Sequence, residues 1–411
     1  MVKISRYILV FTAIIGLSVV LPQFYRMAFE KPTKTPLIQY SCIDHDFMIF
    51  RPDADDKWTN REGTKLTREA YEKKLPLMYT RQLVMDGTMP DSINGQKINI
   101  QHTGIFRSIF RITPDEIHAP KPKLYPLFES KSGRANLEMP GDFFRITWRM
   151  EFIDAKSNKI LEEKSRMFSA VLYNRGFKFP AKSINGIPTT RKSCDEGYLV
   201  IDSANQLFHV KMAKGVPFVR KVDLPGEMKF KTIQCVDFSD QLYYAYLFTE
   251  NNELYVLTPY DYMLEKFEVD DINPDEYEIR IYGDYFNFNV ITIGSGFIRT
   301  QVLNRDHNKV DEYTETRPTY QSSSEGKLAQ FLFPAELKIT DDKSSFVNFF
   351  LTVSQSYWWL IFSLVLIAGQ YFIIRLQKKK IRAEIIDLII IAFTGIFGFI
   401  AVNIFPNKFI D

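Results

Sequence analysis

Three long apolar stretches stand out from the pattern of apolar and polar residues along this chain. They cover residues 7–25, 354–374 and 385–405. Each approaches the roughly 20 residues that an α-helix needs to cross the hydrocarbon core of a bilayer. We therefore predict three transmembrane helices. For the first stretch a cleaved signal peptide is the alternative, but its exit, SVVLPQFYR, lacks the small-residue pattern of a cleavage site, which favours an uncleaved anchor.

Basic residues flank these stretches in a way that predicts their orientation. Lys3 and Arg6 precede the first, and RLQKKKIR, with five basic residues and no acid, follows the second. Lys and Arg gather on the cytoplasmic side of membrane proteins. The expected layout is a cytoplasmic tail (1–6), an exported part (26–350), a basic cytoplasmic loop (375–384) and an exported tail (406–411). This predicts a three-pass protein of the inner membrane with a periplasmic main domain. Such a loop also suits anionic lipid, so membrane lipid is an expected partner.

Three polar residues lie near the ends of the predicted spans: Asp387, Gln370 and Asn403. Ionisable residues at bilayer depth are functional candidates by default. Asp387, however, lies within one turn of the start of the third stretch, beside Arg382 and Glu384. We therefore expect all three to be interfacial residues that reach the headgroup region.

The residue pattern in the polar middle of the chain predicts mainly β-strands. Residues 26–96 read as a mixed α/β segment, with a helical region over 67–85 that Thr67 caps and Pro76 divides. We expect it to be the one convincing helical region outside the membrane. Residues 97–320 carry short β-rich runs separated by turn signals, which predict a series of hairpins. Residues 321–350, beginning with the polar QSSSEGK, are expected to be a linker and a last strand.

The hairpins repeat with a fixed spacing. Asn158, Asn205 and Asn252 occupy turns, and each is followed by one polar and two apolar residues; the spacings are 205 − 158 = 47 and 252 − 205 = 47. A looser fourth copy falls near residues 294–297. A period in the forties with several strands per unit is the size of a propeller blade. The fold class we predict is a mainly β domain of propeller-like repeats, with an irregular sandwich as the alternative.

Composition excludes some functions. Charged residues make up 25% of the 411 residues, too many for a chain that lies mostly in lipid, and the net charge of +3 implies no general attraction to nucleic acid. Gly326 and Lys327 lack a preceding phosphate loop, so nucleotide binding is not expected. Three cysteines, Cys42, Cys194 and Cys235, are too few for a disulfide framework.

Candidate chemistry is weak throughout. The histidines are His45, His102, His118, His209 and His307. His45 lies three residues after Cys42, between Asp44 and Asp46, yet no second ligand pair follows, which favours a surface loop over a metal site. Around Cys194, residues 192–197 (KSCDEG) indicate a structural turn or half of a disulfide. Residues 53–56 (DADD) do not fit a calcium loop. We therefore predict no catalytic, cofactor-binding or metal residues and no cofactor.

Four segments resemble a known family. They are residues 75–96, 124–130, 177–202 and 207–219, including LYPLFES and LFHVKMAKGVPFV. They are similar to a domain-of-unknown-function family of Bacteroidota membrane proteins. The resemblance implies an inner-membrane location and association with an ABC-type exporter, because such proteins tend to be encoded beside transporter components. It carries no catalytic residues.

Two functions follow as hypotheses. The first is a membrane-anchored accessory or binding protein that acts with ABC-transporter subunits or another envelope complex, and is not an enzyme. The alternative is an envelope hydrolase for glycans or esters, which needs only two suitably spaced carboxylates in the β domain. A channel or transporter is the poorest interpretation, because the three spans contain no clearly intramembrane charge, unless the protein oligomerises.

Overall fold

The structure is a computed structural model that describes residues 2–31, 34–100, 104, 106–238, 242–340 and 347–407. It divides into two compact units. Unit 1 comprises Met1–Lys34 and Thr316–Asp411, and unit 2 comprises Thr35–Glu315. Each unit is described by itself. The segments predicted as separate, 26–96 and 97–320, contribute most of their residues to the same unit 2.

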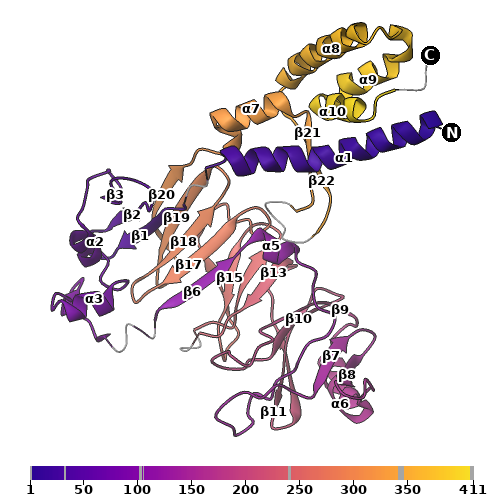
Figure 1. Ribbon diagram of the computed structural model, residues 1–411. Helices are drawn as coiled ribbons and strands as arrows, with labels where there is room; N and C mark the ends of the chain where they lie inside the picture. The colour runs from indigo at the N-terminus through magenta and orange to yellow at the C-terminus, as the bar shows by residue number, and fades with distance from the viewer. Residues whose placement is uncertain are drawn as a thin grey trace. The chain divides into compact units, whose positions relative to one another are not determined.

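Unit 2 is built from small antiparallel sheets (Figure 1). Three of them are consecutive meanders of four strands each: β9 (Ala181–Gly186) to β12 (Val216–Val222), β13 (Phe230–Cys235) to β16 (Leu264–Phe267), and β17 (Glu278–Gly283) to β20 (Lys309–Thr316). The inner strands of these meanders are β10 (Tyr198–Asp202), β11 (Leu207–Ala213), β14 (Ala245–Thr249), β15 (Leu254–Leu257), β18 (Asn287–Ile293) and β19 (Phe297–Asn304). An earlier strand, β6 (Ser108–Ile112), adds to the free edge of β17.

Smaller sheets complete unit 2. The first sheet contains β1 (Leu37–Ser41), β2 (Asp46–Phe50) and β3 (Trp58–Asn60). Two hairpins follow, β4 (Ser92–Ile93) with β5 (Gln96–Lys97), and β7 (Asp142–Ile146) with β8 (Met150–Asp154). The prediction of many short antiparallel strands is thus confirmed.

The asparagine repeat marks one kind of turn. Asn158, Asn205 and Asn252 all adopt positive φ, at 55°, 59° and 61°. Each donates its backbone N–H to a carbonyl three or four residues earlier, at 2.9 to 3.1 Å. Asparagine tolerates this left-handed conformation better than most residues. The repeat is a real structural period, and at Asn205 and Asn252 it joins the second and third strands of a meander.

The first copy of the repeat departs from the others. After β8 and the Asn158 turn, the chain forms helix α6 (Glu162–Asn174) instead of further strands. The prediction that 67–85 is the one helical region outside the membrane is therefore wrong. Ser165, Phe168 and Leu172 recur at helical spacing and are buried, and this 3.6-residue period identifies the helix. A short helix, α5 (Pro114–His118), also lies in this range.

The helical prediction over 67–85 is confirmed with its division. Helix α2 (Arg68–Lys74) ends just before Pro76 and α3 (Thr80–Met85) follows it. Thr67 caps α2, because its hydroxyl accepts the backbone N–H of Ala70 at 3.2 Å.

Apolar side chains fill the spaces between neighbouring sheets of unit 2. Between β9–β12 and β13–β16 lie Leu199, Leu207, Val222, Ile233 and Leu247. Between β13–β16 and β17–β20 lie Tyr246, Phe248, Phe267, Ile281 and Phe288. Phe144, Phe152, Phe168, Tyr198 and Phe208 join β7, β8 and α6 to β9–β12, while Ile38, Phe47, Ile49, Ile291 and Val302 join β1–β3 to β17–β20.

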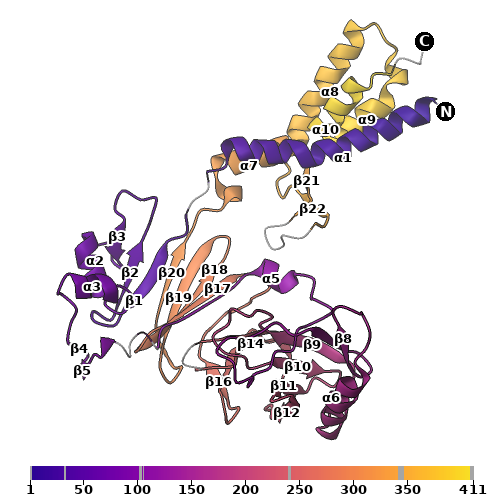
Figure 2. The ribbon, with the colours of Figure 1, turned by 60° about the horizontal axis from the view of Figure 1, so that its bottom comes forward.

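Because a middle sheet has a neighbour on both faces, whole strands such as β10 and β14 are buried. Continuous apolar runs therefore replace strict alternation in these strands. In Figure 2 the sheets of unit 2 follow one another as a row of blades, with β1–β3 and α6 at its opposite ends.

Unit 1 contains the apolar helices. They are α1 (Val2–Phe29), α8 (Trp358–Leu376), α9 (Ile385–Thr394) and α10 (Ile396–Ile404), accompanied by α7 (Ser324–Leu332) and the hairpin β21 (Ala335–Lys338) and β22 (Phe350–Val353). Helices α1 and α8 are long and apolar enough to cross a membrane.

The predicted polar linker at 321–327 is instead the start of α7. The hydroxyl of Ser323 accepts the backbone N–H of Gly326 at 3.0 Å, so QSSSEGK is a helix-capping sequence. Gly326 itself fits closely against the carbonyl of Tyr320, where a side chain has no room. Its role is packing.

The predicted third transmembrane helix over 385–405 is wrong as a single helix. It breaks at Gly395, whose φ of 56° and ψ of −128° are accessible mainly to glycine, so α9 ends at Thr394 and α10 begins at Ile396. With 10 and 9 residues, each piece is only about 15 Å long, half of the roughly 30 Å hydrocarbon core.

The two pieces form a hairpin, and the chain returns to where it started. Asn407 donates its side-chain amide to the carbonyl of Ala383 at 3.3 Å. Gly395, at the tip, packs near Ser363 of α8 and Pro334. Figures 1 and 2 show α9 and α10 side by side. The end of α10 therefore lies at the same end of the bundle as the basic loop. The predicted tail 406–411 is described only to residue 407, and its exported position stays a prediction.

Candidate functional site

The helices of unit 1 bury a charged pair. The guanidinium of Arg6 in α1 donates to both carboxylate oxygens of Asp387 in α9, at 2.9 and 2.6 Å. Arg6 also donates from Nε to the carbonyl of Phe405, just after α10, at 2.7 Å. The exposed fractions of Arg6 and Asp387 are 7% and 1%. One side chain thus joins the start of α1, the start of α9 and the end of α10.

The expectation that Asp387 is a plain interfacial residue is therefore wrong. Its buried carboxylate is stabilised by a bidentate pair with Arg6, which a residue facing lipid headgroups does not need. Gln370 and Asn403 also pair with each other, at 2.7 Å between α8 and α10. The signal that sequence reasoning missed was charge complementarity between the first and third apolar stretches.

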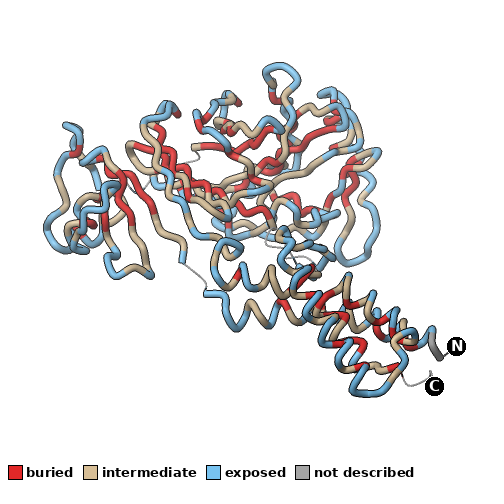
Figure 3. The backbone as a smooth tube through the Cα atoms, turned by 90° about the horizontal axis from the view of Figure 1, so that it is seen from above, coloured by how far each residue is buried: buried red, intermediate tan, exposed pale blue. Residues whose placement is uncertain are grey.

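The outer faces of the same helices are apolar and uncovered. In the most apolar 18-residue segment of α1 only 11% is buried within the protein, and in the corresponding segment of α8 only 17% is buried. Figure 3 shows these helices mostly exposed or intermediate, whereas the sheets of unit 2 are largely buried. Unit 1 therefore buries the Arg6–Asp387 pair beside a small apolar cluster and leaves many large apolar side chains on its outer surface.

Unit 2 contains an aromatic cleft of about 730 Å³. Its walls are the loop 129–137, the turn 193–196, strands β11 and β12, and the segment 258–263. The aromatic side chains that line it are Phe218, Tyr244, Tyr260 and Tyr262. The rest of the lining is mainly polar and charged. A cleft of this size that combines aromatic faces with polar groups is a candidate binding site for a small molecule.

Two tyrosines of this cleft have strained backbones. Tyr260 and Tyr262 adopt φ of 67° and 62°, which is rare for bulky residues. Arg220 holds the segment, because it donates to the carbonyl of Tyr260 at 3.2 Å and lies 4.2 Å from the ring centroid of Tyr262. Strain that the surroundings maintain is common at ligand-binding sites.

His209 fixes the position of Tyr262 from behind. Its Nδ1 lies 2.6 Å from the hydroxyl of Tyr262, and its Nε2 contacts the carbonyl of Glu196. Because a carbonyl only accepts, Nε2 carries the proton and Nδ1 accepts from the tyrosine. Burial lowers the pKa of His209 to about 4, so the imidazole is neutral and positions the ring without adding charge.

The carboxylates that line the cleft are already satisfied. Glu129 accepts the backbone N–H groups of Lys214 and Gly215 at 2.6 and 2.8 Å, and such bonds lower its pKa although burial opposes them. Asp195 is paired with Lys192, and Glu196 accepts from Lys211 at 2.7 Å.

A glycosidase needs one carboxyl that stays protonated. Outside the cleft, burial raises the pKa of Asp284, but the cavity beside it is only about 60 Å³. The cleft therefore offers no candidate for the protonated carboxyl group that the hydrolase alternative needs.

The turn around Cys194 is structural. The ammonium of Lys192 is buried, donates to the carbonyl of Ile187 at 2.9 Å and lies 4.1 Å from the ring centroid of Phe128. Cys42, Cys194 and Cys235 form no disulfide, so Cys194 is not half of one here. Burial raises the pKa of the Cys42 and Cys235 thiols to about 12, which makes them poor nucleophiles.

The structure separates the residues of the weak metal pattern. Asp44 pairs with Lys74, and Asp46 lies 3.2 Å from Arg61. His45 sits in the turn between β1 and β2 with φ of 52°. The described residues contain no group of three or more His, Cys, Asp or Glu side chains placed to hold a metal.

The remaining histidines have local roles. His307 bonds to the hydroxyl of Tyr243 at 2.7 Å and stacks on Phe267. His118 lies 3.3 Å from the carbonyl of Asp275. His102 is outside the described residues.

Residues 37–303 match a family model described as "Domain of unknown function (DUF4857)". The chain belongs to this family. The DUF4857 match begins at β1 and ends in β19, so it lies within unit 2 and includes every residue of the aromatic cleft. The expected resemblance to a domain-of-unknown-function family is confirmed for these residues, while its Bacteroidota origin and its association with an exporter stay predictions.

No curated protein matches the DUF4857 chain. A similar solved structure is "Dihydro-heme d1 dehydrogenase NirN in complex with DHE", which is 10% identical, covers 64% of this chain and 68% of its own, and has a TM-score of 0.21. At that TM-score the similarity supports no conclusion about fold or function.

Proposed function

We propose that this protein is a membrane-anchored binding protein that presents unit 2 on the exported side of the inner membrane and acts there with an envelope complex, such as an ABC-type transporter. One observation carries the membrane assignment: α1 and α8 of unit 1 leave most of their apolar surface exposed, while the charged pair Arg6–Asp387 is buried. In water this arrangement exposes two apolar helices, whereas in a bilayer lipid covers them.

The ion pair supports retention of α1. Removal of α1 as a signal peptide would leave Asp387 buried without its arginine, which is strongly unfavourable. The N-terminal anchor is therefore a permanent part of unit 1. The topology that follows has two spans, α1 and α8, and a re-entrant hairpin, α9–α10. It puts the start of α1, the basic loop and residue 407 together on the cytoplasmic side.

The aromatic cleft supports a binding role for unit 2. Basic side chains line the cleft, namely Lys131, Arg134 and Arg220, and the carboxylates that line it are satisfied within the protein. The cleft therefore favours negative charge. Aromatic rings offer flat faces for stacking. The ligand that fits is ring-bearing and negatively charged, and an acidic sugar of the cell envelope has this chemistry.

Cysteine labelling in intact cells tests the topology. In a background with Cys42, Cys194 and Cys235 replaced by alanine, single reporters are placed by Gln377→Cys, Asp411→Cys and Glu227→Cys. A membrane-impermeant thiol reagent should label only the reporter at 227 until the cells are opened. Labelling at 411 but not at 377 would contradict the re-entrant hairpin and restore a third span. Extraction of the protein by alkaline carbonate would contradict the membrane assignment itself.

A panel of acidic and neutral oligosaccharides tests the ligand class by calorimetry on the full chain in detergent. Acidic members should bind at least tenfold more tightly than neutral ones of the same length. If acidic and neutral oligosaccharides bind equally weakly, the aromatic cleft is not a binding site for acidic sugars.

A further inference from the structure

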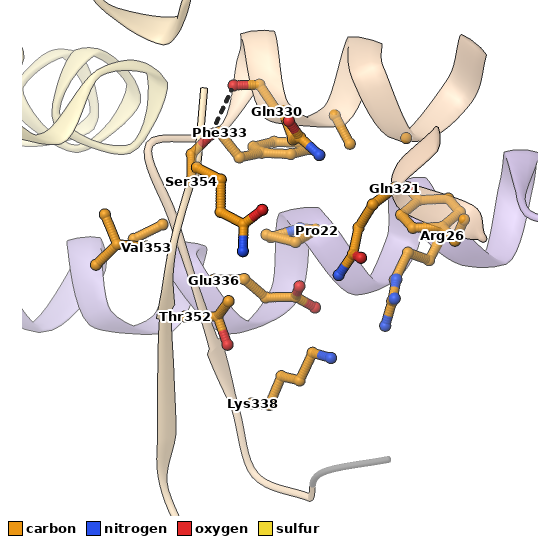
Figure 4. Close-up of a pocket in the computed structure, with 15 residues that line it drawn as sticks. Pro22, Arg26, Gln321, Gln330, Phe333, Glu336, Lys338, Thr352, Val353 and Ser354 are labelled. Atoms are coloured by element: carbon orange, nitrogen blue, oxygen red, sulfur yellow. Dashed lines mark hydrogen bonds between the residues drawn. The ribbon is translucent and has the colours of Figure 1, made fainter. Parts of the chain in front are cut away.

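Unit 1 has a pocket where the apolar part of α1 ends (Figure 4). It has a volume of about 110 Å³. Pro22 and Arg26 of α1 form one wall, and α7, β21 and the end of β22 form the others.

The position of this pocket along α1 is that of a membrane surface. Between Arg6 and Arg26 the chain carries no Asp, Glu, Lys or Arg. Twenty residues of helix rise about 30 Å, the thickness of the hydrocarbon core. If Arg6 lies at the cytoplasmic boundary, as the proposed function has it, then Arg26 and the pocket lie at the opposite boundary. Trp358, at the start of α8, is 65% exposed and belongs to the residue type that favours this level.

The pocket is amphipathic. Pro22, Phe333 and Val353 supply apolar surface, whereas Arg26, Glu336 and Lys338 supply charges of both signs. Figure 4 shows the carboxylate of Glu336 and the amide of Gln321 extending into the space beside Pro22. Glu336 and Lys338 are two residues apart on β21 and so share one face of the strand.

Two polar atoms at this pocket are buried without a hydrogen-bond partner among the described residues: Nε of Arg26 and the hydroxyl of Tyr320. The guanidinium of Arg26 lies 4.7 Å from the ring centroid of Tyr320, which holds it in place. Its nearest carboxylate is that of Glu30, at 3.6 Å, beyond a good hydrogen bond. Buried donors without partners are rare, and a bound ligand is one explanation for them.

We infer that this pocket binds the headgroup of a zwitterionic phospholipid with a primary amine, its phosphate toward Arg26 and Lys338 and its ammonium toward Glu336. Guanidinium and phosphate form charge-assisted hydrogen bonds. The carboxylate of Glu336 disfavours a purely anionic headgroup, and a choline headgroup has no N–H to donate to it. The acyl chains extend from the apolar side formed by Pro22, Phe333 and Val353.

Lipid retention by the full-length protein tests this assignment. The protein is purified from bilayers that contain equal amounts of phosphatidylethanolamine, phosphatidylglycerol and phosphatidylcholine, and bound lipid is counted by native mass spectrometry. Wild type should retain phosphatidylethanolamine about tenfold over the other two. Glu336→Gln should abolish this preference, and Arg26→Gln should lower retention of all three at least tenfold.

Matched controls lie on α7, outside the pocket. Glu325→Gln and Lys327→Gln remove one charge of each sign from the same unit and should leave retention unchanged. Glu336→Gln is close to isosteric, so it reports on selectivity even where Arg26→Gln fails to fold.

Three results would overturn the inference: equal retention of the three lipids by wild type, an unchanged preference in Glu336→Gln, or binding of soluble glycerophosphoethanolamine as tight as that of the lipid. The proposed function fails separately, by extraction of the protein with alkaline carbonate. A protein that stays in the membrane but shows no lipid preference would refute the headgroup assignment alone.

Discussion

The two units of this protein differ in what they expose: unit 2 buries most of its large apolar side chains, whereas unit 1 buries a charged pair beside a small apolar cluster and leaves many large apolar side chains exposed. In unit 2, phenylalanines and tyrosines such as Phe208 and Tyr246 fill the spaces between sheets. In unit 1, Arg6 and Asp387 occupy the interior while residues such as Phe11 and Leu364 are exposed. Water drives apolar groups together in unit 2. In the bilayer proposed for unit 1, lipid would cover the exposed apolar side chains, and polar groups would be satisfied by pairing with one another.

The largest expected effect comes from breaking the polar interior of unit 1. Arg6→Leu leaves the Asp387 carboxylate buried and unpaired and removes the bond to Phe405, which should cost about 3–5 kcal/mol of stability. Thermal unfolding in detergent and the amount of protein in membranes measure this loss. The double variant Arg6→Leu/Asp387→Leu should recover most of it, because apolar replacement of a buried pair is often neutral. If the double variant is as unstable as Arg6→Leu, the loss of stability does not come from the unpaired Asp387 carboxylate.

The matching test for unit 2 removes part of its apolar interior. Phe208 is fully buried, with its ring 5.0 Å from that of Phe177, so Phe208→Ala should destabilise unit 2 by about 3–5 kcal/mol. Limited proteolysis should then digest unit 2 and leave the helices of unit 1 in the membrane fraction. Tyr173→Ala, at an exposed position of α6, is the control and should change stability by less than about 0.5 kcal/mol. If proteolysis of Phe208→Ala digested unit 1 and unit 2 together, the two units would not be stabilised separately.

Acid should weaken unit 2 through its buried histidines. Burial lowers the pKa of His209 and His307 to about 4, from 6.5 for the exposed side chain. Between pH 6.5 and 4 the unfolded chain therefore binds protons that the folded chain does not, and stability falls as the pH falls. Each histidine should contribute on the order of 3 kcal/mol to this loss. The free energy of unfolding against pH should show a smaller slope in His209→Gln than in wild type. An unchanged slope would assign the acid sensitivity to other groups.

The tip of the re-entrant hairpin offers a smaller test. Gly395→Ala forces a side chain into a backbone conformation reserved for glycine and toward Ser363, at an expected cost of about 1–3 kcal/mol. Gly369→Ala in α8 is the matched control, because a side chain there meets open space, and it should be neutral or slightly stabilising. Equal unfolding temperatures for the two variants would contradict the break at Gly395.

The sequence predicted local structure in both units well. Helices α1 and α8 followed from apolar length, and the turns at Asn158, Asn205 and Asn252 followed from a repeat of polar and apolar positions. These features are decided by residues close together in the chain. Helix α6 was recognisable from its 3.6-residue period, yet neighbouring β-rich runs obscured it.

Features decided by distant residues were not predictable in the same way. Arg6 and Asp387 are 381 positions apart, and Gly395 lies in an apolar stretch that is long enough to span as one helix. The aromatic cleft likewise combines residues 129–137, 193–220 and 244–262. A single sequence shows which residues are unusual, but the fold decides which of them meet.

The smallest effect on stability is expected where the effect on function is largest. The side chain of Tyr260 is 75% exposed, so Tyr260→Gly loses little packing, and its φ of 67° suits glycine better than tyrosine. Stability should therefore stay within about 0.5 kcal/mol of wild type or rise slightly. Binding of an acidic oligosaccharide, measured by calorimetry, should fall at least fivefold, because one of the aromatic faces is gone. If stability rises and binding does not change, the strain at Tyr260 is unrelated to a ligand, and the cleft would then be a surface feature of unit 2 and not its site.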